Sequence, residues 1–182
     1  MKRFFPLMTL LALLTLSSYG ADTKQVLALY RDGDFRQACK SGLSAYYAGS
    51  REAHFAAMVG MACAKSDMIN PLGDLQRPLV KTPSLRSTAT FFATLQLAKR
   101  LLYQHFVDGL DIKGFTLPKY DHILSIVYDH VSRGDFTTME HGEMLIVDGQ
   151  RNIIVSLSRG TPPRVLVDEY EAGQRIRRHW YK

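Results

Sequence analysis

Residues 27–65 read LALYRDGDFRQACKSGLSAYYAGSREAHFAAMVGMACAK, and this stretch decides the architecture of the chain. Apolar residues three and four apart up to Tyr30 predict a first helix. It ends at Gly33, because glycine readily adopts the backbone conformation that closes a helix. Asp34 is a favoured N-cap for a second helix, and Ser50 is one for a third. We therefore expect three short helices in succession.

The same stretch resembles a tetratricopeptide-type (TPR or Sel1-type) helical repeat over about residues 24–66. In that family a turn of glycine, an acid and an aromatic residue joins two antiparallel helices, and small residues follow at set positions. The residues that match this pattern are Gly33, Asp34, Phe35, Ala38, Ala45 and Gly60. The chain departs from the pattern at Gly42, where a large aromatic residue is usual, and at Ser50, where proline is usual. The resemblance implies a TPR-like α lobe with a groove for another protein or peptide; a plain helical hairpin is the alternative.

The two cysteines, Cys39 and Cys63, fall on the second and third of these helices, which are expected to be neighbours. In an exported chain two cysteines most simply form a disulfide. The alternative is a pair of buried thiols that pack as small apolar residues. The chain has no C-x-x-C motif, which disfavours a thiol oxidoreductase.

The first twenty residues have the pattern of a secretory signal peptide. Lys2 and Arg3 form a basic start, residues 7–16 form an apolar core, and Gly20 is a small residue at the expected cleavage site. The apolar core is too short to span a bilayer as a stable helix. We therefore predict a periplasmic protein without an integral membrane span once residues 1–20 are removed.

The charge of the chain excludes few functions but disfavours one. The chain has 23 basic and 17 acidic residues, a net charge of +6. Without Lys2 and Arg3 there are 21 basic and 17 acidic residues, which leaves +4. That excess is too small and too scattered to indicate nucleic acid binding, so we expect none.

The rest of the chain predicts more helix followed by strands. Apolar stripes predict a long helix over 84–108 and another over 119–133, which Gly134 ends. From residue 143 the apolar period becomes two, which predicts two hairpins. The first pairs 144–148 with 152–158 around an Asp-Gly turn, and the second pairs 164–171 with 174–181 around an Ala-Gly turn.

Together these elements predict an α+β fold, with an N-terminal TPR-like α-helical lobe followed by a small C-terminal antiparallel β-sheet of about four strands. The expected domains are the signal peptide at 1–20, the α lobe at 21–134 and the sheet at 135–182.

Few residues suggest chemistry. His122 and His130 lie eight residues apart on one helix, which is not the spacing of a metal-binding pair, and we interpret them as solvent-facing polar positions. The chain has neither a Gly-x-Ser-x-Gly motif nor a phosphate-binding P-loop. We therefore assign no catalytic residue, no metal ligand and no cofactor.

The C-terminal run is the better candidate for a partner-binding site, since arginine beside aromatic residues is typical of interface hot spots. We assign this role to Arg175, Arg177, Arg178, Trp180 and Tyr181. On a regular strand Arg178 and Trp180 share one face and Arg175, Arg177 and Tyr181 share the other. Asp168 is then expected opposite Arg177. The alternative is that Trp180 packs inward and the charges are only solvated.

The sequence thus favours a non-catalytic interaction module or scaffold of the bacterial cell envelope, whose partner is another envelope protein or peptide. The alternatives are an envelope enzyme that acts on cell wall through an unrecognised active site, and a structural subunit of a larger envelope machine.

Overall fold

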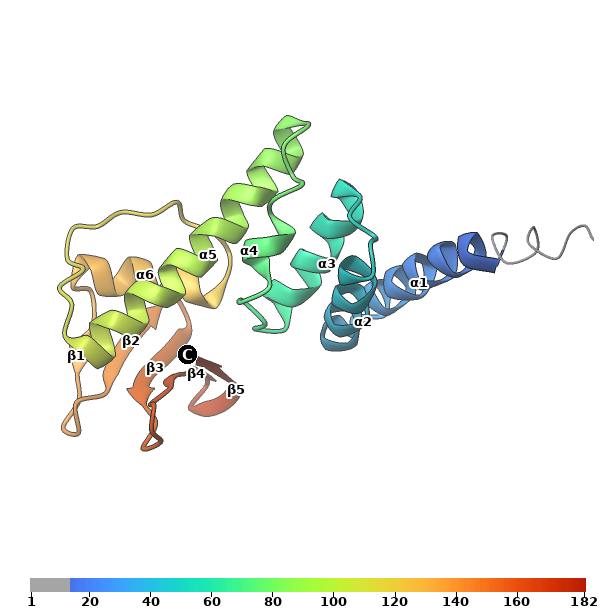
Figure 1. Ribbon diagram of the computed structural model, residues 1–182. Coiled ribbons are helices and arrows are strands. Elements are labelled where there is room, and N and C mark those ends of the chain that lie inside the picture. The colour runs from blue at the N-terminus through green and yellow to red at the C-terminus, as the bar shows by residue number, and fades with distance from the viewer. Residues whose placement is uncertain (1–13) are drawn as a thin grey trace, which may run out of the picture. The chain divides into compact units, whose positions relative to one another are not determined.

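The computed structural model describes residues 14–182, with side chains described from residue 23 on. In this part of the chain six helices precede a five-stranded antiparallel sheet, which confirms the α+β fold (Figure 1). The helices are α1 (Leu14–Arg31), α2 (Phe35–Tyr47), α3 (Ala53–Lys65), α4 (Leu72–Leu75), α5 (Pro83–Asp108) and α6 (Ile123–Arg133). The strands are β1 (Thr137–Thr138), β2 (Met144–Asp148), β3 (Arg151–Leu157), β4 (Val165–Glu171) and β5 (Gln174–Tyr181).

The predicted signal peptide lies largely outside the described residues. The helix α1 is described from Leu14 and runs through the expected cleavage site after Gly20, so cleavage stays a prediction. Among residues 14–182, every helix is too short or too polar to cross a membrane.

The chain forms two compact units, residues 1–89 and 90–182, and the division falls inside α5. The predicted boundary at 134/135 instead marks the change from helix to strand, and that change does occur between Arg133 and Thr137. The two units are described separately below.

In unit 1 the helices α1, α2 and α3 pack in sequence, and α4 packs on α3. Cys39 on α2 and Cys63 on α3 form the predicted disulfide, with an S–S distance of 2.07 Å. The carboxylate of Asp34 caps α2 as predicted, by accepting a hydrogen bond from the backbone N–H of Gln37 at 3.1 Å.

The cap of α3 was predicted wrongly. Ser50 is buried before the helix, and the N-cap is Glu52, whose carboxylate accepts hydrogen bonds from the backbone N–H groups of His54 and Phe55. The bond from His54, followed by that from Phe55, lowers the pKa of Glu52 against the opposing effect of burial. A longer side chain thus does here what the shorter hydroxyl was expected to do.

Gly42 lets α2 approach α3 closely. A Cβ atom at this position would lie 2.8 Å from one methyl carbon of Val59 and closer still to the other. Valine is stiff at χ1, so its methyl groups cannot simply turn away. This contact explains why a large aromatic residue is absent at position 42.

We expect Gly42→Ala to destabilise unit 1. Overpacking of this kind costs about 1 to 3 kcal/mol, whereas the better helix propensity of alanine returns at most about 1 kcal/mol. Urea unfolding followed by circular dichroism measures the net loss. Ser44→Ala on the same helix is the control, because it removes an exposed hydroxyl group instead of adding a carbon atom at the contact. An unchanged or raised stability of Gly42→Ala would show that the helices do not approach this closely.

In unit 2 the sheet is a simple meander with the strand order β1-β2-β3-β4-β5. Ile146 lies opposite Ile153 and Met144 opposite Val155, as the first predicted hairpin requires. One face of the sheet is buried, and we call it the inner face. Its fully buried members are Ile146, Ile153, Val155, Val165, Val167, His179 and Tyr181.

The second hairpin has the predicted turn but not the predicted register. A register shift at Glu169/Tyr170 places Asp168 opposite Arg178 rather than Arg177, and Tyr170 opposite Arg175. Ile176 consequently has no residue opposite it in β4. Such a bulge inserts one residue and moves every side chain on one side of it to the other face of the strand.

Candidate functional site

The face of the sheet opposite the buried one, which we call the outer face, is unusually apolar. In strands β2 to β5, paired positions place eleven residues on it: Leu145, Val147, Asn152, Ile154, Ser156, Leu166, Asp168, Tyr170, Arg175, Arg178 and Trp180. Val147 and Trp180 are 62% and 51% exposed, and the other apolar side chains are half-buried. An antiparallel sheet with one buried face usually turns polar residues to water on the other. Six of the eleven side chains are apolar or aromatic, and such a share on the open face marks a surface suited to a partner.

On this face the ring of Trp180 forms a cation–π contact. The guanidinium of Arg164 lies 4.3 Å from the centroid of the Trp180 ring. A cation at this distance over a tryptophan face is attracted by the ring quadrupole. Even with this contact, about half of the Trp180 side chain stays exposed to solvent.

The arginines of β5 are not equivalent. Arg178 forms a bidentate ion pair with Asp168, at 2.7 and 2.6 Å, and Asp168 is only 5% exposed. These hydrogen bonds raise the pKa of Arg178. Arg175 lies further from the same carboxylate, at 3.8 Å. Arg178 therefore has a structural role, since its loss would leave a buried carboxylate without its main partner.

The predicted partner-binding residues divide between the two faces. The bulge brings Arg175 to the outer face with Arg178 and Trp180, whereas Arg177 lies opposite Glu169 on the inner side. Tyr181 is buried on the inner face, at 3% exposed, and stacks on His179. Only the first three lie on the face that is open to a partner.

Sequence reasoning missed the apolar members of this face and Arg164. The signal was present, because MLIVD in β2 and NIIV in β3 are apolar at both alternating positions. In each of these runs, only the alternate residues that face the core were interpreted.

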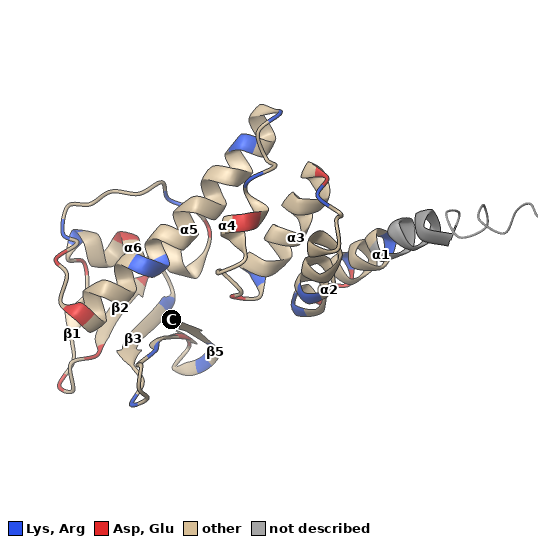
Figure 2. Cartoon of the chain, viewed as in Figure 1, with Lys and Arg blue, Asp and Glu red and all other residues tan. Residues whose placement is uncertain are grey.

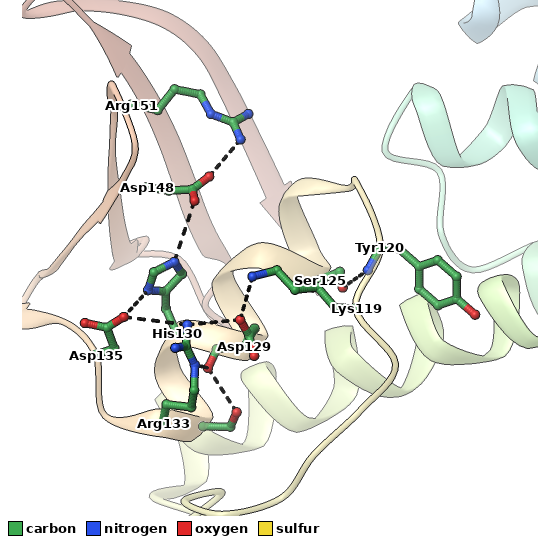
Figure 3. Close-up of polar contacts among 10 residues, drawn as sticks. Lys119, Tyr120, Ser125, Asp129, His130, Arg133, Asp135, Asp148 and Arg151 are labelled. Carbon is green, nitrogen blue, oxygen red and sulfur yellow. Dashed lines mark hydrogen bonds and ion pairs between the residues drawn. The ribbon is translucent and has the colours of Figure 1, made fainter.

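A second polar cluster lies where α6 meets β2, and Figure 3 shows it around His130. His130 was interpreted as solvent-facing, and this is wrong, because the side chain is buried. Its Nδ1 lies 2.9 Å from Asp135 Oδ2, an ion-pair distance without hydrogen-bond geometry, and its Nε2 lies 3.9 Å from Asp148 Oδ1. His122 instead caps α6, where its Nδ1 accepts from the N–H of Leu124.

The cluster continues across the inner face of the sheet. Arg151 contacts Asp148 at 2.8 Å and Glu169 at 3.5 Å, and Glu169 lies 2.7 Å from Nε2 of His179. The acidic residues Asp148 and Glu169 thus alternate with Arg151 and His179 from β2 to β5. This network connects strands β2 to β5, and His130 links it to α6 through Asp148.

Asp129 links the same helix to the loop before it. Its carboxylate contacts Lys119 and Arg133, each at 3.0 Å. Burial acts to raise the pKa of Asp129, but the hydrogen bond from Lys119 and the charges of Lys119 and Arg133 outweigh it and lower that pKa. These contacts fix the loop before α6 against the helix.

Neither cluster has the composition of a metal centre. Among the described residues, no three His, Cys, Asp or Glu side chains are grouped so that they would hold a metal ion. Lys and Arg are mixed with Asp and Glu along the elements of both units (Figure 2).

No protein-family model, curated protein or solved structure matches the chain. The resemblance to tetratricopeptide-type repeats therefore stays a prediction.

Proposed function

We propose that the protein is a non-catalytic interaction module of the bacterial cell envelope, and that it binds another envelope protein through the outer face of its sheet. The observation that carries the proposal is the half-exposed Trp180, stacked by Arg164 and set among apolar side chains on a face that is otherwise expected to be polar. Tryptophan and arginine are the residue types that dominate binding energy in interfaces.

The charges of this face favour an acidic partner. The positive groups on or over this face are those of Arg164, Arg175 and Arg178. The acidic group of the eleven outer-face residues is Asp168, which is buried and paired with Arg178. Three positive groups against one negative group leave an excess of positive charge around the apolar centre. Charge complementarity of this kind steers association and selects partners.

The proposed compartment is the periplasm. The disulfide between Cys39 and Cys63 supports it, because disulfides persist in oxidising compartments. The basic and apolar pattern of residues 1–20 supports it independently.

We expect the double variant Val147→Ser/Trp180→Ser to lose its partner. Removing a central hot spot costs about 2 kcal/mol or more, which corresponds to a loss of binding of about thirtyfold or more. The measurement is quantitative co-purification of the tagged chain from envelopes of producing cells.

The matched control is Phe115→Ser, which removes an aromatic side chain of comparable exposure from the loop between α5 and α6. Both variants should unfold like the unsubstituted protein, because the altered side chains are exposed. Equal recovery of the same partner with both variants would refute the outer face as the binding surface.

A further inference from the structure

Unit 1 contains a cavity of about 460 Å³ at the ends of α2 and α4. Its lining residues are Tyr46, Tyr47, Arg51, Asp74, Arg77 and Pro78. The volume lies in the range of pockets that hold small molecules or single side chains of a peptide. Aromatic rings and guanidinium groups thus line one pocket.

The aromatic wall of the cavity is fixed by hydrogen bonds. The hydroxyl of Tyr46 donates to the carbonyl of Asp74, and that of Tyr47 donates to its carboxylate, each at 3.0 Å. The two rings meet edge to face at 5.5 Å. Burial and the hydrogen bond to Asp74 raise the pKa of Tyr47, so the phenol stays protonated and keeps donating at neutral pH. The wall is therefore already formed before any ligand arrives.

The cavity is also lined by two positively charged side chains, Arg51 and Arg77. Asp74 is already engaged by Tyr47 and by Arg77, which lies 3.4 Å from its second oxygen. The guanidinium of Arg51 lies 5.8 Å from the Tyr46 ring centroid and has no carboxylate partner within residues 23–182. Two arginines against one aspartate leave one positive charge at a pocket with aromatic walls.

We propose that this cavity binds a carboxylate attached to an aromatic group, with the carboxylate on Arg51 and the ring against Tyr47, whose side chain is exposed. Guanidinium matches a carboxylate with two parallel hydrogen bonds, and tyrosine faces accept a planar ring beside it. A small aromatic acid and an acidic residue beside an aromatic one in a peptide share this chemistry. The site lies in unit 1 and does not depend on the outer face of the sheet.

The test uses the mature chain labelled with ¹⁵N and two probes, phenylacetate and the dipeptide N-acetyl-Glu-Phe-amide. We expect at least one probe to cause saturable shifts of the Arg51 and Tyr47 amide signals. Binding of the dipeptide alone would identify a peptide segment as the natural source, and binding of phenylacetate would identify a small acid. Arg51→Gln should weaken binding by about tenfold or more, because a charge-assisted contact is lost. Arg36→Gln, at another exposed arginine of unit 1, should leave it unchanged.

Three results would overturn the proposal. The first is that neither probe causes saturable shifts. The second is that uncharged phenylacetamide, or phenylphosphate, binds as well as or better than the carboxylate probes. The third is that Arg51→Gln keeps full affinity while the rest of its amide spectrum is unchanged.

Discussion

Phe92→Ala is expected to lower the free energy of unfolding of unit 2 by about 3 to 5 kcal/mol. Phe92 lies on α5 and is among the largest side chains that are completely buried. Truncation to alanine loses the transfer free energy of the ring and leaves a cavity that rigid neighbours fill only in part. Phe91, which contacts both Phe92 and Tyr120, is part of that surrounding wall.

Trp180 provides the measurement, because it is the single tryptophan of the chain and belongs to unit 2. Urea unfolding followed by its fluorescence reports this unit, whereas circular dichroism reports both. Leu97→Ala is the control, since Leu97 lies on the same helix and is 45% exposed. A loss below about 0.5 kcal/mol, the range of surface substitutions, would show that α5 is peripheral to the core.

The second large effect is expected from the double variant Cys39→Ala/Cys63→Ala. The disulfide joins cysteines 24 residues apart, both fully buried. Cross-links that close a loop of this length stabilise a fold by about 3 kcal/mol. The same loss is expected from reducing the unsubstituted protein.

Circular dichroism should record this loss, while the fluorescence transition of Trp180 should stay in place because the cysteines lie in unit 1. The double variant should not respond to reductant, which separates loss of the disulfide from other effects of the reagent. Thiol labelling of the denatured, unreduced protein should find no free cysteine. Two labelled thiols in protein purified from the periplasm would contradict the pairing.

Local rules predicted most of the fold. The Asp-Gly turn and the alternation of apolar residues determine the register of β2 and β3, since a slip of one residue would turn Ile146 and Ile153 to water. The end of α6 at Gly134 was predictable for the same reason, because its φ of 70° suits glycine, whereas the start of that helix lies at Ile123 and not at residue 119 as predicted.

The errors arose where tertiary contacts decide. The bulge at Glu169/Tyr170 allows Arg178 to reach the buried Asp168, and no local pattern in β5 announces it. His130 was assigned to the surface because polar residues of an amphipathic helix usually face solvent, yet its side chain lies against Asp135 and near Asp148 of β2. Of the outer face, the sequence pattern placed only Arg178 and Trp180 together, and Arg175 was expected on the other face. The other apolar members of the outer face come from three strands that meet only in the folded sheet.

The central claim is that the outer face of the sheet contacts another envelope protein. Photo-crosslinking in intact producing cells tests it most directly, with the photoreactive residue in place of Asn152, an exposed outer-face position. Lys113, exposed in the loop before α6, is the matched position away from that face. We predict one dominant adduct from position 152, its loss when Trp180→Ser is added, and no such adduct from position 113. The same adduct from both positions, or an adduct from position 152 that persists with Trp180→Ser, would contradict the account.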